Sequence, residues 1–326
     1  MASAEDHLWL DAAARLAGRG VPLSRPNPAV GALLVKDGTV IARGWTMSGG
    51  RPHAEAVALA AAGAAARGAT LYVTLEPCAH KSARGPACAD LVAAAGLARV
   101  VIGCGDPDPR TAGAGIAHIR ASGTPVELAE NAACAASLAG YLARTAHGRP
   151  HVTLKLALSL DGCIALADGT SRWITGPAAR AHVHAERARA DAILVGGGTL
   201  RADDPRLDVR LPGLEARSPE RWLLTRGPAP AGWRALSSPR AIFGQAAQYL
   251  FVEGGAGAAA AFLAADLVDR LLVYRAPILI GAGKPALGPI GLSALTEAHG
   301  RWRLSDRRSL GNDTLEVYER CRSSEG

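Results

Sequence analysis

Apolar segments alternate between strand-like and helix-like patterns along the first half of the chain, and this alternation constrains the fold more than any other feature. Two short apolar runs at 29–35 and 40–44 flank Lys36-Asp37-Gly38, which predicts a hairpin. Further strands are expected at 70–75, 99–103 and 125–128, and helices at 54–66, 88–95, 114–121 and 130–144. Strands that alternate with helices imply a layered α/β domain.

A second pattern of the same kind begins after His147-Gly148-Arg149-Pro150, which is typical of a linker. A chain of 326 residues has room for two domains with separate cores, so we expect domains at 1–147 and 148–326. In the second, strands are expected at 151–159, 191–196, 221–225, 249–253 and 270–275, helices at 177–189 and 256–265, and a closing hairpin at 302–306 and 314–320.

The charge and composition of the chain argue against several classes of function. The net charge of +7 is spread over both halves and only 4% of residues are aromatic, whereas nucleic-acid-binding proteins concentrate basic residues and interleave aromatic ones. We therefore expect a phosphorylated small molecule, and no nucleic acid, as the partner. No apolar run approaches the roughly 18 residues of a membrane span, and the acidic N-terminus is unlike a secretion signal. These features predict a cytoplasmic protein with no membrane partner.

Two of the six cysteines stand in a pattern that indicates a metal site. Cys78 follows Glu76-Pro77 at the end of an expected strand, and Cys88 begins the next expected helix. His53 comes directly after Pro52 at the entrance of another helix, where proline is favoured. The remaining cysteines lie in apolar surroundings and are expected to fill the core: Cys104, Cys134, Cys163 and Cys321.

One imidazole and two thiolates leave the fourth position of a tetrahedral zinc ion open, as catalytic zinc sites do. Zinc makes a bound water acidic, and such a water can attack the amino-bearing carbon of a purine or pyrimidine ring. Glu55, two residues after His53, is placed to carry protons from this water to the leaving amine. A structural zinc site is the alternative, and it would need a fourth ligand such as His80.

Several motifs of the first half resemble the deaminase half of the bifunctional deaminase/reductase family of riboflavin biosynthesis. They are Pro26-Asn27-Pro28-Ala29-Val30-Gly31, His53-Ala54-Glu55, Glu76-Pro77-Cys78-Ala79-His80 and Asp106-Pro107-Asp108-Pro109 with Gly113 and Gly115. The resemblance covers essentially the whole chain. It implies a cytidine-deaminase-like three-layer domain that holds Zn²⁺ and hydrolytically deaminates 2,5-diamino-6-ribosylamino-4(3H)-pyrimidinone 5′-phosphate. The chain departs from the family in spacing Cys78 and Cys88 one residue further apart and in placing Asp108 where asparagine is usual.

The resemblance also implies substrate contacts in the first domain at Asn27, His80 and Arg84. Asn27 lies between two prolines, and its amide can both donate to and accept from a pyrimidinone edge. A simple turn before the first strand is the alternative role for Asn27. Arg84, counted back from Cys88, stands where the family has a basic residue.

Residues 151–162 and 171–175 resemble the reductase half of the same family, which implies a dihydrofolate-reductase-like α/β domain that uses NADPH. The expected strand at 191–196 runs into a glycine-rich turn, where backbone N–H groups can approach phosphate. Glu253-Gly254-Gly255-Ala256-Gly257 ends a strand and opens a helix, and helix N-termini bind anions. A plain strand-to-helix turn is the alternative for this last segment.

The resemblance assigns roles in the second domain residue by residue. Cofactor contacts are implied at Ala157, Trp173, Thr199, Asp203, Gly255, Ala256, Gly257, Ala258, Ala259, Ala260 and Ala261. Substrate contacts are implied at Ser171, Arg187, Leu207, Arg210 and Glu253. The reaction implied is reduction of the ribosyl group to a ribityl chain. From the residues alone, Trp173 could instead be core, Arg187 a solvated helix face and Arg210 an ordinary surface charge.

The second domain departs from the family between Leu224 and Tyr249, where the chain is short enough to predict the loss of a strand and a helix. An alternative interpretation is therefore a deaminase whose shortened second domain is non-catalytic and serves binding or dimerisation. A deaminase of another nucleobase and a zinc-stabilised scaffold are further alternatives. The even charge argues against the first, and Glu55 against the second. We expect a homo-oligomer, in the form of a dimer.

Overall fold

The computed structural model describes residues 2–80 and 84–322 of the chain. It divides into two compact units, Met1–Gly148 and Arg149–Gly326, which are considered separately below. Within the described ranges, no helix combines the length and apolar character needed to cross a membrane.

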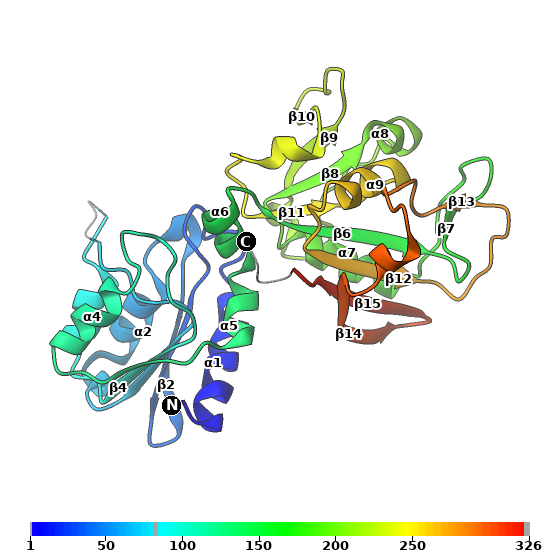
Figure 1. The fold of residues 1–326 in the computed structure, drawn as a ribbon. Helices are drawn as coiled ribbons and strands as arrows, with labels where there is room; N and C mark the ends of the chain where they lie inside the picture. The colour runs from blue at the N-terminus through cyan, green and yellow to red at the C-terminus, as the bar shows by residue number, and fades with distance from the viewer. Residues whose placement is uncertain (1, 81–83, 323–326) are drawn as a thin grey trace. The chain divides into compact units, whose positions relative to one another are not determined.

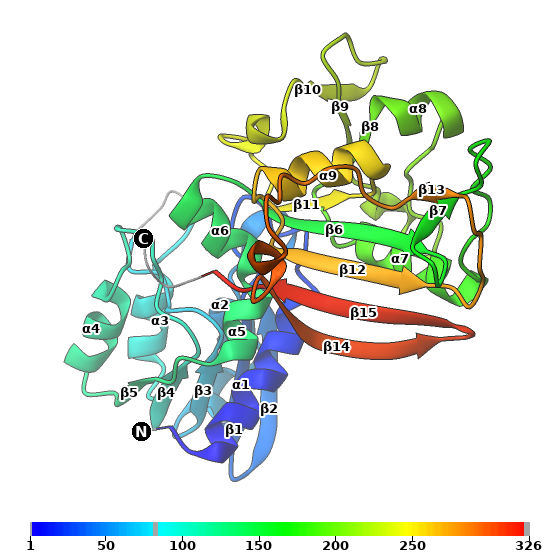
Figure 2. The same cartoon turned by 45° about the vertical axis from the view of Figure 1, so that its right-hand side comes forward.

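Unit 1, drawn in Figure 1, is built on a five-stranded sheet with the order β2-β1-β3-β4-β5, whose strands are labelled in Figure 2. The strands are β1 (Gly31–Lys36), β2 (Thr39–Trp45), β3 (Thr70–Val73), β4 (Arg99–Ile102) and β5 (Val126–Leu128). β1 runs antiparallel to β2 and β3, whereas β3, β4 and β5 are parallel. Asp37 and Gly38 join the hairpin with φ angles of 51° and 69°, so the predicted turn is confirmed.

Helices cover both faces of this sheet and make three layers. They are α1 (Ala4–Ala17), α2 (Ala54–Ala62), α3 (Cys88–Ala94), α4 (Ala114–Ala121), α5 (Ala132–Ser137) and α6 (Ala139–His147). Leu33 and Val35 on β1 pack with α1 and α5. Their neighbours Ala32 and Leu34 pack on the opposite face with α2, α3 and α4. Alternate residues of β1 thus serve two cores, as expected for a strand in a sheet covered on both faces.

Two details of unit 1 differ from the sequence prediction. The first helix, α1, was not predicted, although Ser3 and Asp6 form a capping box at its start. The expected single helix at 130–144 is two helices, α5 and α6, because the backbone leaves the helical range at Leu138. Asp6 also accepts from Tyr72 Oη at 2.9 Å and pairs with Arg99, which fixes α1 to the sheet.

Unit 2 contains an eight-stranded sheet with the order β10-β9-β8-β11-β6-β12-β15-β14 (Figure 2). Its strands are β6 (His151–Leu158), β8 (Ala192–Gly196), β9 (Glu220–Leu224), β10 (Trp233–Leu236), β11 (Tyr249–Val252), β12 (Arg270–Arg275), β14 (Trp302–Leu310) and β15 (Asp313–Arg320). The strands from β10 to β12 in this order are parallel, and β15 and β14 close the sheet antiparallel. A small second sheet pairs β7 (Cys163–Ala165) with β13 (Lys284–Pro285).

Helices also lie on both faces of the larger sheet. Phe262 of α9 (Ala256–Ala264) packs with Trp222 on one face, and Val183 of α7 (Pro177–Arg187) packs with Tyr274 on the other. A third helix, α8 (Gly197–Asp203), follows β8 directly, so the glycine-rich segment expected to be a turn is helical. The short 3₁₀ helices of the chain are η1 (Ser48–Gly50), η2 (Gly63–Ala66), η3 (Glu215–Arg217), η4 (Pro239–Ile242) and η5 (Leu295–Ala298).

The shortened stretch between Leu224 and Tyr249 keeps more structure than the sequence predicts. The stretch forms one strand, β10, which is paired in parallel with β9 at the edge of the sheet. It also contains the 3₁₀ turn η4. β10 was not predicted because its four residues give a weak sequence signal.

Candidate active site

Three segments of unit 1 bring the predicted metal ligands together. His53 is the N-cap residue of α2, with an extended backbone and no capping hydrogen bond from its side chain, so the imidazole is turned to the site. Cys78 follows the end of β3, and Cys88 is the first residue of α3. In the part of the chain that the structure describes, His53, Cys78 and Cys88 are the residues grouped closely enough to hold a metal ion.

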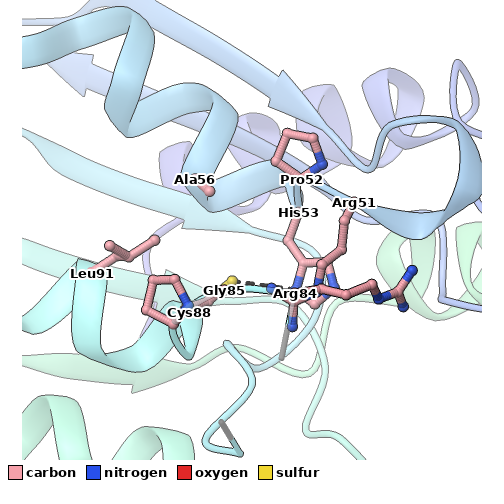
Figure 3. Close-up of a pocket in the computed structure, with 9 residues that line it drawn as sticks. Arg51, Pro52, His53, Ala56, Arg84, Gly85, Cys88 and Leu91 are labelled. Atoms are coloured by element: carbon pink, nitrogen blue, oxygen red, sulfur yellow. Dashed lines mark hydrogen bonds between the residues drawn. The ribbon is translucent and has the colours of Figure 1, made fainter. Parts of the chain in front are cut away.

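The distances within this group suit zinc. Nδ1 of His53 lies 3.6 Å from the sulfur of Cys78 and 3.3 Å from that of Cys88, and the contact with Cys88 is drawn in Figure 3. A tetrahedral ion with bonds of about 2.0 Å to nitrogen and 2.3 Å to sulfur separates such atoms by about 3.6 Å. His80 lies outside this group, and its Nδ1 is 3.5 Å from the hydroxyl of Thr111.

The pKa values of the two thiols are shifted strongly in opposite directions. A hydrogen bond with the Cys88 thiol, helped by His53 and the Cys88 amide, lowers the pKa of Cys78 to about 4. The same interaction with Cys78, together with burial, raises the pKa of Cys88. The thiolate form of Cys78 is therefore stabilised by its neighbours, and a bound Zn²⁺ would stabilise the thiolate form of Cys88 as well.

Glu55 lies in the first turn of α2 and is only 3% exposed. Burial raises the pKa of Glu55 to about 6. Its Oε2 atom is buried and makes no hydrogen bond to any group that the structure describes. A buried carboxylate oxygen without a partner is costly, and a metal-activated water beside the thiolates would satisfy it. The residues present therefore fit a catalytic zinc site.

Asn27 lies against the imidazole of His53. Its Nδ2 atom is 2.8 Å from His53 Nε2 and donates to the carbonyl of Gly50 at 2.9 Å. Its backbone N–H donates to the carbonyl of Ser24, so Asn27 also belongs to a turn. The side-chain amide thus contacts the ring nitrogen opposite the one that faces the thiols.

Glu76 is a buried residue whose role the sequence analysis missed. Its carboxylate is 3% exposed and accepts from the backbone N–H groups of Gly113 at 3.0 Å, Ile116 at 3.1 Å and Asp106 at 3.3 Å. These bonds hold the loop at 105–116 against the segment that carries Cys78. Gly115 fits this close approach because a Cβ atom there would lie 2.1 Å from the carbonyl of Pro77.

A cavity of about 260 Å³ opens beside the metal ligands. Its lining is made by Arg51, Pro52, His53, Ala56, Arg84, Gly85, Pro86, Cys88 and Leu91 (Figure 3). Arg84, a predicted substrate contact, is exposed and donates to the carbonyl of Gly49 at 3.2 Å. The extra residue in the spacing between Cys78 and Cys88 falls in the same loop, of which residues 81–83 lie outside the described ranges. Arg51 was not predicted from the sequence.

A second cluster lies in unit 2. Glu253, just after β11, accepts from Arg187 of α7 at 2.5 and 3.0 Å, and Lys155 Nζ lies 3.8 Å away. Burial opposes the charge of Glu253, but Arg187 and Lys155 outweigh it and hold the pKa of this carboxyl below its ordinary value. Burial in turn lowers the pKa of Lys155. Arg187 is therefore a partly buried ion-pair residue, not part of a solvated helix face.

The other substrate residues predicted for the second domain lie on segments that are held by different contacts. Arg187 also donates to the carbonyl of Asp208, which ties the segment carrying Leu207 and Arg210 to α7. Leu207 is buried with a φ of 56°, while Arg210 is exposed and its N–H donates to His184. The segment containing Ser171 is linked to the end of α8 by a bond from Arg172 to the Asp203 carbonyl.

The predicted cofactor residues differ in how much of each side chain is exposed to a ligand. Trp173 is 66% exposed under the guanidinium of Arg180, so a core role for this ring is wrong. Thr199 accepts from the N–H of Gly255 at 2.7 Å, which joins α8 to the start of α9. Ala157 is half-buried on β6, and the side chains of Ala258, Ala259 and Ala260 face the core, so these last three can contact a ligand only through their backbone.

Comparison with known proteins agrees with this architecture. Residues 3–104 match the cytidine and deoxycytidylate deaminase zinc-binding region, and residues 150–245 and 240–315 match the RibD C-terminal domain. The chain is 35% identical to the riboflavin biosynthesis protein RibD of Haemophilus influenzae over 97% of its own length and 98% of the relative's. It is 40% identical to the Corynebacterium ammoniagenes protein over 79% and 82%, respectively.

Solved structures are similar over the whole chain. Acinetobacter baumannii RibD superposes with a TM-score of 0.86 at 33% identity, covering 98% of this chain and 99% of the other. A deaminase/reductase from Thermotoga maritima gives 0.87 at 30% identity, covering 97% and 99%.

The fold and the site together define a two-domain enzyme, in which a zinc-binding deaminase domain precedes a reductase domain. The chain belongs to the RibD family of riboflavin biosynthesis. Both domains of that family are present, which favours the bifunctional interpretation over the deaminase-only alternative, and the predicted fold class is confirmed.

Proposed function

We propose that unit 1 hydrolytically deaminates 2,5-diamino-6-ribosylamino-4(3H)-pyrimidinone 5′-phosphate and that unit 2 then reduces the ribosyl group of the product to ribityl with NADPH. The observation that carries the proposal is the group of His53, Cys78 and Cys88 with Glu55 buried beside it. The Thermotoga maritima relative is described as a diaminohydroxyphosphoribosylaminopyrimidine deaminase and 5-amino-6-(5-phosphoribosylamino)uracil reductase, which supports the choice of substrates. We assign the first activity to residues 1–147 and the second to 148–326, and the division of the structure after Gly148 supports this assignment.

In the deaminase site, His53, Cys78 and Cys88 would hold Zn²⁺, which supplies an acidified water for attack on the ring. Glu55, through its buried Oε2 atom, would take up a proton during the attack and deliver it to the leaving amine. Its pKa of about 6 suits this double role, because a group that titrates near neutral pH can both take and give a proton. Asn27 keeps the His53 ring in place, and His80 and Arg84 are proposed to contact the substrate.

In unit 2, NADPH would supply the hydride, and the protein would orient the two reactants. The first N–H groups of α9, from Ala256 onwards, have no partner within the helix and would bind a cofactor phosphate. Glu253 lies at the end of a central strand, close to Lys155 and Arg187, and these groups are proposed to surround the sugar. Contacts with NADPH at Trp173, Thr199 and Asp203 belong to the same proposal.

The test separates the two activities. Zinc-loaded protein is incubated with the diaminopyrimidinone substrate and ammonia is measured; NADPH oxidation is then followed with the deaminated product as substrate. We expect both signals. Release of ammonia without NADPH oxidation at saturating cofactor would support the deaminase-only alternative. Absence of ammonia release from the diaminopyrimidinone would refute the deaminase assignment.

Two further expectations are also proposals: the chain acts in the cytoplasm, and it forms a homodimer. Size-exclusion chromatography with light scattering tests for the homodimer. A monomeric mass at the concentration used in the activity assays would contradict it.

A further inference from the structure

The cavity beside the metal ligands carries two positive charges that the predicted chemistry of the ring does not use. Arg51 and Arg84 line it together with His53 and Cys88, and its described lining contains no carboxylate. A pyrimidinone ring is neutral, whereas two guanidinium groups that line one cavity favour an anion. The cavity is therefore built for a substrate with a negatively charged group beside the ring.

The local sequence holds Arg51 at this position. Gly49 and Gly50 precede it with φ angles of 73° and 83°, which glycine adopts without strain. A Cβ atom on Gly50 would lie 2.8 Å from Asn27 Cγ, so the loop can pack on Asn27 only with glycine there. Pro52 follows and disfavours helical backbone for Arg51, whose φ and ψ of −149° and 151° are extended.

The two arginines reach across to each other's loops. Arg84 donates from Nη1 to the carbonyl of Gly49, in the loop that carries Arg51. A Cβ atom on Gly85 would lie 3.5 Å from Arg51 Nη1, so the guanidinium of Arg51 lies against the loop that carries Arg84. The two arginines therefore lie close to each other, on two loops that line the same cavity.

Arg51 differs from the structural arginines of the chain in its partners. Arg149 is bound by both oxygens of Asp269, and Arg99 is paired with Asp6. Across residues 2–80 and 84–322, no carboxylate is found within ion-pair distance of Arg51. Its charge is neutralised by no described side chain although it lies at the metal site.

We propose that Arg51 is a specificity-determining residue of the deaminase, which binds the phosphate monoester of the substrate together with Arg84. The inference rests on the proposed function and goes beyond it, because it assigns the phosphate to a residue in the loop before His53. A guanidinium can donate two parallel hydrogen bonds to phosphate oxygens, whereas a lysine there would act as a single point charge. If Arg51 instead only braces the loop, its loss would affect all substrates equally.

The test compares the phosphorylated substrate with its dephosphorylated counterpart in ammonia-release assays. The variants are Arg51→Ala, Arg51→Lys and the control Arg43→Ala, which removes an exposed arginine on β2 outside the cavity. Arg51→Ala is expected to raise KM for the phosphorylated substrate roughly 10- to 100-fold, the range of one or two charge-assisted hydrogen bonds, and to leave KM for the dephosphorylated one almost unchanged. Arg51→Lys should fall between, and Arg43→Ala should match wild type.

An independent readout is competition by ribose 5-phosphate, which should inhibit wild-type deamination and lose most of its potency in Arg51→Ala. Zinc content is measured in every variant, and if Arg51→Ala loses zinc, Arg51→Lys decides the question. Equal changes for both substrates, or no change for either, would overturn the role of Arg51 while wild-type deamination stands. Failure of the wild type to deaminate either substrate would instead refute the proposed function, and with it this inference.

Discussion

Replacement of Glu76 is expected to release the loop at 105–116, although Glu76 binds neither metal nor substrate. One carboxylate oxygen, Oε2, accepts from the N–H groups of Gly113 and Asp106, and the other, Oε1, accepts from Ile116. All three bonds are made by a side chain that is almost fully buried. The loop also carries Thr111, which contacts His80 at the edge of the proposed substrate site.

The size of the effect follows from the number of donors left without a partner. An unsatisfied buried N–H group costs about 1–3 kcal/mol, and some of the three would find water as the loop opens. Glu76→Ala should therefore cost about 3–6 kcal/mol of unit 1 stability, a large share of the 5–15 kcal/mol typical of a domain. Glu76→Gln keeps one acceptor oxygen in the place of Oε2 but sets an amide donor against Ile116, so it should cost roughly 1–3 kcal/mol.

Hydrogen exchange measured by mass spectrometry on the zinc-loaded full chain gives the local readout, since peptides from 105–116 report on this loop alone. We expect faster exchange at Gly113 and Ile116 in the order Glu76→Ala, Glu76→Gln, wild type. Glu130→Gln, at an exposed glutamate of the same unit, is the matched control and should stay within about 0.5 kcal/mol. If Glu76→Ala exchanges like this control, the three hydrogen bonds do not hold the loop and the reasoning is refuted.

Three other predictions concern the metal site and unit 2. Glu55→Gln should keep its zinc and lose about 10²- to 10⁴-fold in deaminase rate, and full activity would end its assignment as the proton carrier. Cys88→Ser should lower zinc content by metal analysis and destabilise unit 1, whereas stoichiometric zinc would point to His80 as a ligand. Burial lowers the pKa of His151 from its ordinary value of 6.5 to about 4. As the pH falls, the unfolded state therefore binds this proton before the folded state does. The free energy of unfolding of unit 2 should fall by about 2–3 kcal/mol between pH 6.5 and pH 4. Urea unfolding followed by tryptophan fluorescence should show this loss in wild type and a flatter profile in His151→Gln; equal profiles would contradict it.

The grouping of the proposed metal ligands His53, Cys78 and Cys88 could be predicted because the position of each is set by local sequence. Pro52 marks the entrance of a helix and leaves His53 at its N-cap, and Glu76-Pro77 ends the strand before Cys78. Helix α1 also had a local signal, since Ser3 and Asp6 have the spacing of a capping box. Its short run of mixed polar and apolar residues, Asp6 to Asp11, hides the helical periodicity that would have supported it.

Arg51 and Glu76 could not be assigned from the sequence because their roles depend on contacts between distant loops. Arg51 stands in an ordinary polar loop until Gly85, 34 positions later, is brought against it. Glu76 lies in a family motif, but its bonds with Gly113 and Ile116 form only when the start of α4 folds against the segment that follows β3. In the same way, Arg187 and Glu253 are 66 residues apart in the sequence, and their ion pair forms only when α7 packs on the sheet that contains β11.

The position of the shortened segment explains why the second domain can lose chain without losing its cluster of charges. β10 and η4 lie at one edge of the sheet, beyond β9 and β8, whereas Lys155 and Glu253 come from the neighbouring central strands β6 and β11. A shorter connection at this edge changes neither the pairing of β6 with β11 nor the bond from Arg187 to Glu253. Catalysis depends most on groups that orient the reacting atoms, and contacts remote from them mainly contribute binding energy. The shortening should therefore act on cofactor affinity before it acts on hydride transfer, which is the behaviour of a working reductase with a reduced surface and not of a relic.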